Sequence, residues 1–540
     1  METEDKQPVT EEAETPEVTQ DAAAPEETVK TESDGTAVAQ TPYKGFAAKL
    51  DKFFGISGKG STFRREIVGG LVTFMAMVYI LIVNSNMFSN DVGGALGVSF
   101  GAIYIATAIS AVVGTLLMAL LARLPMAQAS GMGLNAFFVF TICLTLGLSY
   151  ANALILVLID GIVFILLTVT GLRRVIFNAI PKVVRIAVPA GIGLFIAFVG
   201  LQNVGLVVKD GSTGVALASF NLLPESLGGS ATYGSVMPLI VTILGLIAVA
   251  VMAKKGVKGA VLWAILGGAT LYWIFMGIGY AYGDAKCMGV IDGFTFSNPI
   301  DAFKAFGTES VGKVFTEGFD FSAYLSTHNG GSLALVIITS SLAFCMVDMF
   351  DTMGTLYGAC ARGNMLEADG GIPNINKAML CDAIATTVGA VCGTSTVTTF
   401  VESSSGIGAG ARTGFASLIT AACFFVAMFL SPIAEMIPSC ATAIALIYVG
   451  VLMMNCVREI EWTDVGQAVP AFLTIAMMPF TYNISYGIAF GIISWLLIKA
   501  ISMLLCVRNK DALMEEKKEP ISVVTIVIAV LFILMFFLTH

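Results

Sequence analysis

The chain has 540 residues, of which 56% are hydrophobic, only 12% are charged and 56 are glycine. This profile excludes an ordinary soluble enzyme and predicts an all-α polytopic membrane protein that contacts a lipid bilayer along most of its length. The net charge of −9 comes from the first 40 residues, so it predicts neither a basic partner nor binding to nucleic acid.

The amino-terminal region, residues 1–48, is rich in Glu, Thr, Ala and Pro and poor in large apolar side chains. Such a segment cannot bury enough apolar surface to offset its conformational entropy, so we expect an acidic, disordered, cytoplasmic tail. It lacks the basic stub and apolar core of a cleavable signal peptide.

Fourteen apolar runs follow the tail in two sets of seven. The first repeat, 60–282, contains runs at about 66–88, 100–122, 130–147, 150–171, 184–207, 235–253 and 258–282. A polar external loop, 283–331, separates it from the second repeat, 332–506. That repeat contains runs at about 332–358, 377–394, 398–410, 413–432, 438–455, 467–482 and 484–506. A further hydrophobic segment, 520–540, predicts an extra carboxy-terminal helix that either crosses the membrane or lies along it.

Basic residues mark one side of the membrane. Every even-numbered run ends at a basic loop, and these loops carry Arg123, Arg173, Arg174, Lys254, Lys255, Lys258, Arg362, Arg412, Arg458, Arg508 and Lys510. Because cytoplasmic loops are enriched in Lys and Arg, this pattern predicts a cytoplasmic amino terminus and an external loop at 283–331.

The two sets of seven runs resemble each other. Phe198-Val-Gly200 in the fifth run corresponds to Tyr448-Val-Gly450 in the twelfth, and Pro181 and Pro438 precede these two runs. Seven is an odd number, so two such repeats must have opposite orientations, as in the inverted repeats of secondary transporters. Chance similarity among apolar helices is the alternative.

Two of the runs are interrupted by polar residues and glycines. The tenth contains the sequence GTSTVTTFVESSSGIGAGART from Gly393 to Thr413, in which Thr394–Val401 is strand-like and the following serines can cap a helix. In the third run, Gln128–Asn135 is a similar polar entry to a short apolar stretch. Irregular backbone at membrane depth persists only where protein buries it or where it lines a cavity. We therefore predict short strands and half-helices in spans 3 and 10, around one site.

Carboxylates inside the runs are few. Asp348 and Asp351 are three residues apart and lie on nearly the same helical face, and Glu402 lies in the interrupted tenth run. Ionisable residues at this depth are candidates for function. Each has a structural alternative: Glu402 as a buried hydrogen-bonding group, one of the aspartates as a support for the broken segment, and Asn135 as a partner for a helix end. A structural role is favoured for the isolated Asp160 and Glu435.

Four motifs in this order, REIVGGLVTFMAMVYILIVN, QASGMGLNAFF, VDMFDTMGT and TTFVESSSGIGAGARTG, resemble those of the AzgA-like purine permeases. These carriers of hypoxanthine, guanine and adenine belong to the nucleobase–cation symporter group. The resemblance covers about residues 60–506. It implies the uracil-permease-type fold of 14 spans as a 7+7 inverted repeat, with a core domain of spans 1–4 and 8–11 and a gate domain of spans 5–7 and 12–14. It also implies proton symport with elevator-type alternating access in the cell (plasma or inner) membrane.

The resemblance also implies a set of functional residues. The predicted substrate-binding residues are Gly133, Asn135, Asp348, Asp351, Val401, Glu402 and Ser403, and the predicted proton-coupling residues are Glu402, Asp351 and Asp348. No metal site or cofactor is expected, and a homodimer is compatible with the sequence. One departure affects substrate choice: Ser403 follows Glu402, where related uracil and xanthine carriers have a Gln/Glu-Asn pair.

Other functions make different demands on these residues. A sulfate-type anion carrier of the same fold would need a basic group or no carboxylate between the half-helices. A pyrimidine or xanthine carrier remains an alternative within the fold. An intramembrane enzyme would need a nucleophile–base pair or metal ligands, and no histidine lies in any run. A channel would not need a protonatable, closed site at the midplane.

Overall fold

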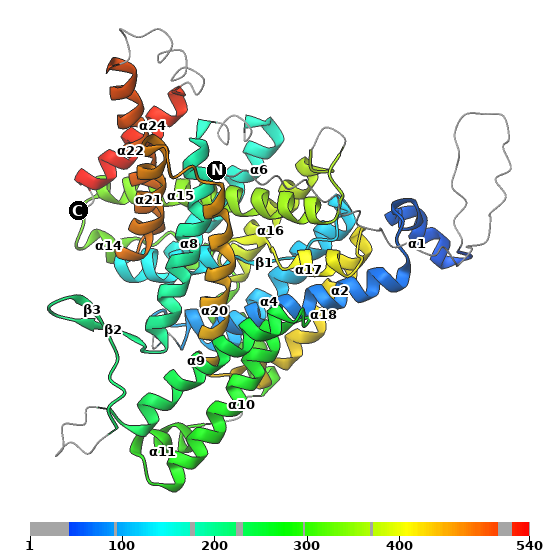
Figure 1. The fold of residues 1–540 in the computed structure, drawn as a ribbon, viewed down its shortest axis with the longest axis vertical. Helices are drawn as coiled ribbons and strands as arrows, with labels where there is room; N and C mark the ends of the chain where they lie inside the picture. The colour runs from blue at the N-terminus through cyan, green and yellow to red at the C-terminus, as the bar shows by residue number, and fades with distance from the viewer. Residues whose placement is uncertain are drawn as a thin grey trace, which may run out of the picture. The chain divides into compact units, whose positions relative to one another are not determined.

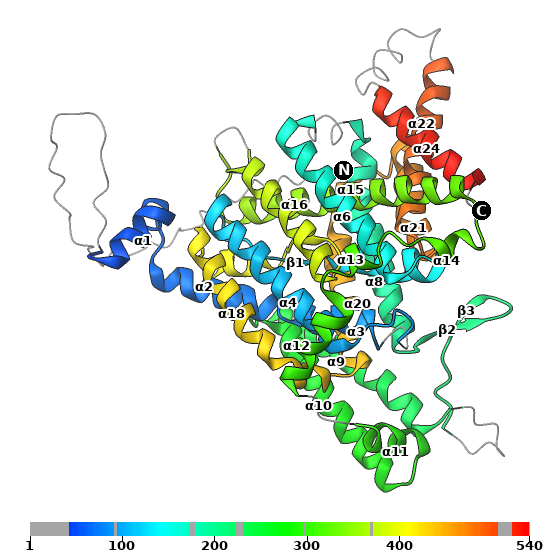
Figure 2. The ribbon, with the colours of Figure 1, turned by 180° about the vertical axis from the view of Figure 1, so that it is seen from behind.

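The computed structural model describes residues 43–90, 94–172, 179–222, 231–294, 298–367, 371–505 and 521–538 (Figures 1 and 2). Nearly all of the predicted acidic tail lies outside these residues, as do Arg173, Arg174, Arg508 and Lys510. The described chain begins with α1 (Phe46–Phe54) and the short turn η1 (Ser57–Lys59).

The first repeat contains spans 1 to 7. In order, they are α2 (Phe63–Met77) with α3 (Tyr79–Phe88); α4 (Phe100–Leu117) with η2 (Met118–Ala122); β1 (Gln128–Ser130) with α5 (Met132–Ala136) and η3 (Phe137–Thr145); α6 (Tyr150–Thr170); α8 (Lys182–Asn203); α9 (Tyr233–Lys254); and α10 (Ala260–Ala281). A hairpin of β2 (Val207–Asp210) and β3 (Gly214–Leu217) follows α8.

The segment predicted as an external loop contains short helices: α11 (Ala285–Asp292), α12 (Pro299–Ala305), η5 (Phe306–Ser310), α13 (Lys313–Thr316) and α14 (Ser322–Leu325). The second repeat contains spans 8 to 14. They are α15 (Gly330–Arg362); α16 (Ile375–Cys392); β4 (Val397–Thr399) with α17 (Ser403–Gly408); α18 (Gly414–Ala427) with η6 (Met428–Leu430) and α19 (Ser431–Glu435); α20 (Ser439–Met453) with η7 (Met454–Glu459); α21 (Val465–Phe480); and α22 (Ile484–Leu505). A last helix, α24 (Val523–Leu538), follows.

The lengths of these helices confirm the 14-span fold with an extra helix. Eleven helices in the described part of the chain are long and apolar enough to cross a membrane. Span 13 and the helical part of span 3 are shorter, and span 10 is a strand followed by a half-helix. Polar side chains fix several helix starts, because Thr62, Ser99, Ser149, Asn329 and Thr413 each accept a hydrogen bond from a first-turn N–H.

Equivalent helices of the two repeats meet at glycines. Pro181 and Pro438 directly precede α8 and α20, which pack against each other. A Cβ added to Gly450 would lie 2.4 Å from the carbonyl oxygen of Gly193, so the two backbones approach too closely for a larger residue. The similarity between the fifth and twelfth runs is therefore reflected in a pair of packed gate helices (Figure 1).

The predicted strands in spans 3 and 10 are confirmed. β1 and β4 pair antiparallel, with Gln128 opposite Thr399 and Ser130 opposite Val397. Beyond the ladder, the Phe400 N–H donates to the carbonyl of Ala127 at 3.0 Å. This pairing satisfies backbone groups that have no water available at membrane depth. Because the strands are antiparallel, α5 and α17 begin at opposite ends of this short strand pair.

The spans alternate in direction, which defines two sides. We call the ends that carry Arg123, Lys254, Arg362, Arg412 and Arg458 the basic side. The ends that carry the segment 283–329 are the opposite side.

Candidate functional site

The strand pair is held from one face by a buried carboxylate. Asp382 of α16 accepts hydrogen bonds from Nε2 of Gln128 at 2.9 Å and from Oγ1 of Thr352 at 2.9 and 3.0 Å. Gln128 is in β1 and Thr352 is in α15, and all three side chains are buried. Asp382 therefore joins α15, α16 and the first strand.

A second buried group holds the other strand. Thr386 of α16 both donates to the carbonyl of Val397 at 3.1 Å and accepts from its N–H at 3.2 Å. Its hydroxyl also lies 3.5 Å from Oδ2 of Asp348, whose Oδ1 has no hydrogen-bond partner among the described residues. Asp348 is fully buried. This predicted site residue thus lies behind the strands, beside groups that support them.

Glu402 and Asp351 differ from this supporting set. Glu402 lies between β4 and α17, and its Oε1 accepts a 2.6 Å hydrogen bond from the hydroxyl of Tyr79. Asp351 of α15 accepts from Oγ1 of Thr398 at 3.3 Å. Both residues are only half-buried, and Thr398, which holds Asp351, belongs to the strand that leads into Glu402. The structure thus brings two of the predicted residues together.

Asn135, the predicted residue from span 3, is fully buried in α5. Its Nδ2 lies 3.5 Å from the carbonyl of Ser130, and its Oδ1 has no partner among the described residues. A buried carbonyl oxygen without a donor is costly, so this position favours a ligand or a water that supplies one.

One face of α17 and one face of α15 border open space. Val401 is 44% exposed, Ser405 is exposed, and a Cβ added to Gly408 would meet nothing within 4 Å. These residues are four and three apart, so they share one face. On α15, Gly354 and Gly358 also face open space and lie three and seven residues after Asp351. Apart from Val401, these exposed positions lie between the two carboxylates and the basic side on each helix.

Gly133 and Ser403, the other two predicted residues, make structural contacts. A Cβ on Gly133 would lie 2.4 Å from Cγ2 of Ile192, so half-helix α5 of the core rests directly on gate helix α8. Oγ of Ser403 accepts a 3.0 Å hydrogen bond from the N–H of Ala127 and ties α17 to the residue before β1.

The two carboxylates for which the sequence favours a structural role differ in their surroundings. Asp160 is buried in α6 with no hydrogen-bond partner among the described residues, and Glu435 is exposed at the end of α19.

Sequence reasoning missed Tyr79 and the supporting role of Asp382. Tyr79 lies in an unbroken apolar run, and only the structure shows that span 1 is interrupted between Met77 and Tyr79. A hydroxyl inside an apolar run was the available signal. For Asp382, the partners Gln128 and Thr352 come from distant runs and could not be paired from the sequence.

Chemically, this arrangement is rich in acceptors. The carboxylates of Glu402 and Asp351 and the carbonyl of Asn135 can accept hydrogen bonds from N–H groups. Within the described part of the chain, no cluster of three His, Cys, Asp or Glu side chains could hold a metal ion. The site is therefore suited to a polar ligand that carries N–H donors, and it disfavours an anion.

Comparison with known proteins places this arrangement in context. Residues 64–490 match the model of a family described as "Permease family" (Xan_ur_permease). The chain is 38% identical to the guanine/hypoxanthine permease PbuG of Bacillus subtilis, over 82% of this chain and 92% of that one. It is 34% identical to the adenine permease AdeP of Escherichia coli, over 83% and 90%. Its fold is similar to that of the murine anion transporter Slc26a9, with a TM-score of 0.54 at 11% identity over 86% of this chain and 74% of that one.

Proposed function

Because the chain belongs to the xanthine/uracil permease family, we propose that it carries purine nucleobases, namely guanine, hypoxanthine or adenine, across the cell membrane. The observation that carries this proposal is Glu402, which is half-buried between a strand and a half-helix, is held by Tyr79 and is adjacent to Asp351. A purine base is flat and neutral, and its ring N–H groups can donate hydrogen bonds to these carboxylates.

The remaining edge of the base requires other partners. Asn135 offers an acceptor whose donor is not supplied by the described residues. The first N–H groups of α5 point away from their own helix, as at any helix start, and can donate to a purine carbonyl or ring nitrogen. We place the base between α5, Glu402 and Asp351, with Val401 and Ser403 forming the turn that positions Glu402. Asp348 supports this site from behind the strands.

Proton symport is the coupling that we propose. Carboxylates are the titratable groups at this site, and one that binds a proton together with a neutral base lets the loaded site cross without a buried charge. Glu402 and Asp351 are the candidates because both adjoin open space. Asp348 is a further candidate because one of its oxygens lacks a partner among the described residues.

Alternating access is proposed from the contacts between core and gate. On the opposite side, Oγ1 of Thr141 in the core donates to the carbonyl of Tyr482 in the gate at 2.9 Å, and Phe140 packs edge-on against the Tyr482 ring. On the basic side, the face of α17 borders open space. We infer that the basic side is cytoplasmic, in keeping with its Lys and Arg content, and that this conformation is open to the inside. Transport then requires the core to move against the gate.

Uptake by purified protein in liposomes tests the proposal. We expect labelled guanine, hypoxanthine or adenine to accumulate when an inward proton gradient is imposed, while uracil and sulfate do not. A sodium gradient alone should drive no accumulation. Uptake that follows sodium and ignores the proton gradient would refute the coupling. Uptake of sulfate or uracil in place of purines would refute the substrate class.

A further inference from the structure

The final helix, α24, lies outside the part of the chain that matches the permease family, which ends at residue 490. It packs against α22 of the gate and also against α15 of the core (Figures 1 and 2). Its buried side chains, Thr525, Ile528, Ala529, Phe532 and Met535, recur every three or four residues and so form one stripe. The other side of the helix is exposed and apolar, as expected for a surface that faces lipid.

The contacts of α24 extend from one side of the transporter to the other. Near its start, Oγ1 of Thr525 donates to the carbonyl of Ala179, in the link that leads into α8 from the basic side. Near its end, Met535 lines one small cavity together with Val336 and Ser340 from the first third of α15, toward the opposite side. A helix of 16 residues is about 24 Å long, which is somewhat shorter than the hydrocarbon thickness of about 30 Å in a typical bilayer. These contacts favour a helix that crosses the membrane.

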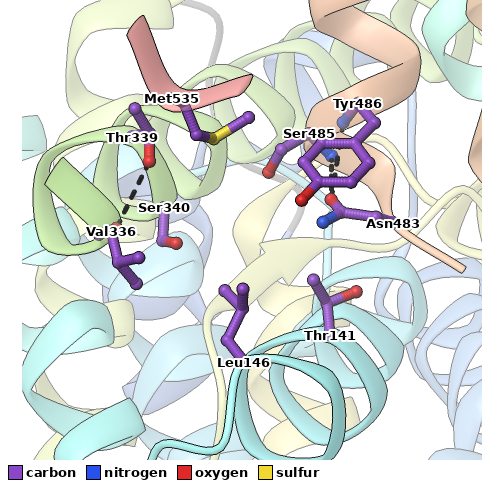
Figure 3. Close-up of a pocket in the computed structure, with 9 residues that line it drawn as sticks. All are labelled: Thr141, Leu146, Val336, Thr339, Ser340, Asn483, Ser485, Tyr486 and Met535. Carbon is purple, nitrogen blue, oxygen red and sulfur yellow. Dashed lines mark hydrogen bonds between the residues drawn. The ribbon is translucent and has the colours of Figure 1, made fainter. Parts of the chain in front are cut away.

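At the opposite side, α24 closes the junction between core and gate. Figure 3 shows Met535 beside Thr339 and above Ser340 of α15, and Thr141 of the core below Asn483 and Tyr486 of the gate. The cavity enclosed there is about 10 Å³, which is near the space of one water molecule. On the gate side, the Phe536 ring packs 5.3 Å from the rings of both Tyr486 and Phe490. The end of α24 thus packs against both domains, and the cavity between them leaves room for about one water molecule.

From this arrangement we propose that α24 is a clamp, built into this chain, that holds the core and gate domains in the conformation described here. The inference rests on the proposed function, because it requires the core to move against the gate. A helix that contacts both domains loses one set of contacts when they separate, so its contacts stabilise the starting conformation selectively. Removal of α24 then shifts the population toward the other conformation and speeds departure from this one.

The test uses full-length protein and three variants in liposomes: a truncation before Ile521, Phe532→Ala on the buried stripe, and Ile533→Ala on the exposed face as the matched control. Counterflow exchange of labelled guanine measures turnover, and equilibrium binding of guanine measures the affinity of the site. We expect the truncation and Phe532→Ala to raise the exchange rate about three- to tenfold, while binding changes less than about twofold. Ile533→Ala should match the wild type in both the exchange rate and the affinity for guanine.

Hydrogen–deuterium exchange without any purine provides a readout that does not depend on the substrate. In the clamp-free variants, exchange should become faster in the segment around Tyr482 and Asn483, which the core covers in this conformation. Unchanged exchange rates in both assays would overturn the clamp, as would a slower carrier. If the wild type binds no purine but the deuterium pattern changes as expected, the proposed substrate fails and the clamp stands. If the truncated chain misfolds, Phe532→Ala and Thr525→Val decide the question, since each leaves the helix in place.

Discussion

The two interrupted spans share one architecture but differ in what their side chains do. In span 3, Gln128, Ser130 and Asn135 are all fully buried, and the half-helix continues through η3 to Thr145. In span 10, the half-helix ends at Gly408, one face is open, and the half-buried Glu402 lies at the junction. The two spans therefore share a backbone geometry, whereas in the site that we propose span 3 mainly supports the strands and span 10 presents the carboxylate.

The same division separates the aspartates around the strands. Asp382 accepts hydrogen bonds from Gln128 and Thr352 and is fully buried, whereas Asp351 accepts one hydrogen bond at 3.3 Å and is only half-buried. Two carboxylates in neighbouring helices can thus differ in role, one supporting the strands and the other available to a ligand. Burial and the number of donors around each one distinguish them, and both are tertiary properties.

Replacement of Glu402 should have the largest effect, because it removes the group that we place on the substrate. A purine N–H left without an acceptor costs about 1–3 kcal/mol, so Glu402→Ala should weaken binding by about 5- to 150-fold and abolish uptake. Glu402→Gln keeps an acceptor oxygen but cannot titrate, so we expect binding or exchange to survive while accumulation under a proton gradient is lost. Binding and gradient-driven uptake, measured side by side, check this.

The control for Glu402 is Glu435→Gln, which alters an exposed carboxylate at the end of α19 and should leave purine uptake near the wild-type level. A well-folded Glu402→Ala carrier with normal uptake would show that the carboxylate that binds the substrate is not in span 10. Poor expression of both Glu402 variants, but not of Glu435→Gln, would instead indicate a structural hydrogen bond to Tyr79.

Substitution of Asp382 should lower thermal stability more than it lowers proton-driven uptake. Asp382→Ala leaves buried donors on Gln128 and Thr352 with fewer acceptors, at about 1–3 kcal/mol for each donor left unpaired. We expect a clearly lower thermal midpoint in detergent, whereas Asp351→Asn, on the neighbouring α15, should keep the midpoint and lose proton-driven uptake. A stable Asp382→Ala protein with a selective loss of coupling would reverse the roles assigned to the two aspartates.

Much of this architecture could be predicted from the sequence because membrane depth restricts the backbone. Apolar length and the glycine-broken polar stretches were sufficient to locate the spans, the two strands and Glu402. The hydrogen-bond partners of individual side chains were harder to predict from the sequence. The link from Tyr79 to Glu402 spans 323 positions, and no local pattern encodes it. Likewise, the resemblance implied that Gly133 binds substrate, and only the structure shows Ile192 of a gate helix beside it, which favours a packing role.

Loss of the Tyr79 hydroxyl should have an intermediate effect. A hydrogen bond to a charged group is worth about 1.5–3 kcal/mol, but the rest of the Tyr79 ring stays buried in Tyr79→Phe, so the core should repack little. We expect proton-driven uptake to fall by about tenfold, with the thermal midpoint nearly unchanged. Tyr104→Phe is the matched control, since that hydroxyl donates to the carbonyl of Ala427, away from the site. Equal losses of uptake in both variants would show that the Tyr79 hydroxyl has no specific role at the proposed site.

The smallest effect, and the most direct test of the difference between the two spans, comes from one methyl group placed on each half-helix. In Gly133→Ala the new Cβ meets Ile192 at 2.4 Å, so α5 and α8 must separate slightly, whereas in Gly408→Ala it meets nothing within 4 Å. Overpacking of this kind costs about 1–3 kcal/mol, and here it falls on a contact between core and gate. We therefore expect Gly133→Ala to change the rate of purine exchange a few-fold with the affinity preserved, and Gly408→Ala to change neither. If Gly133→Ala instead lowers affinity at an unchanged rate, then Gly133 touches the substrate, and span 3 contributes to binding as directly as span 10.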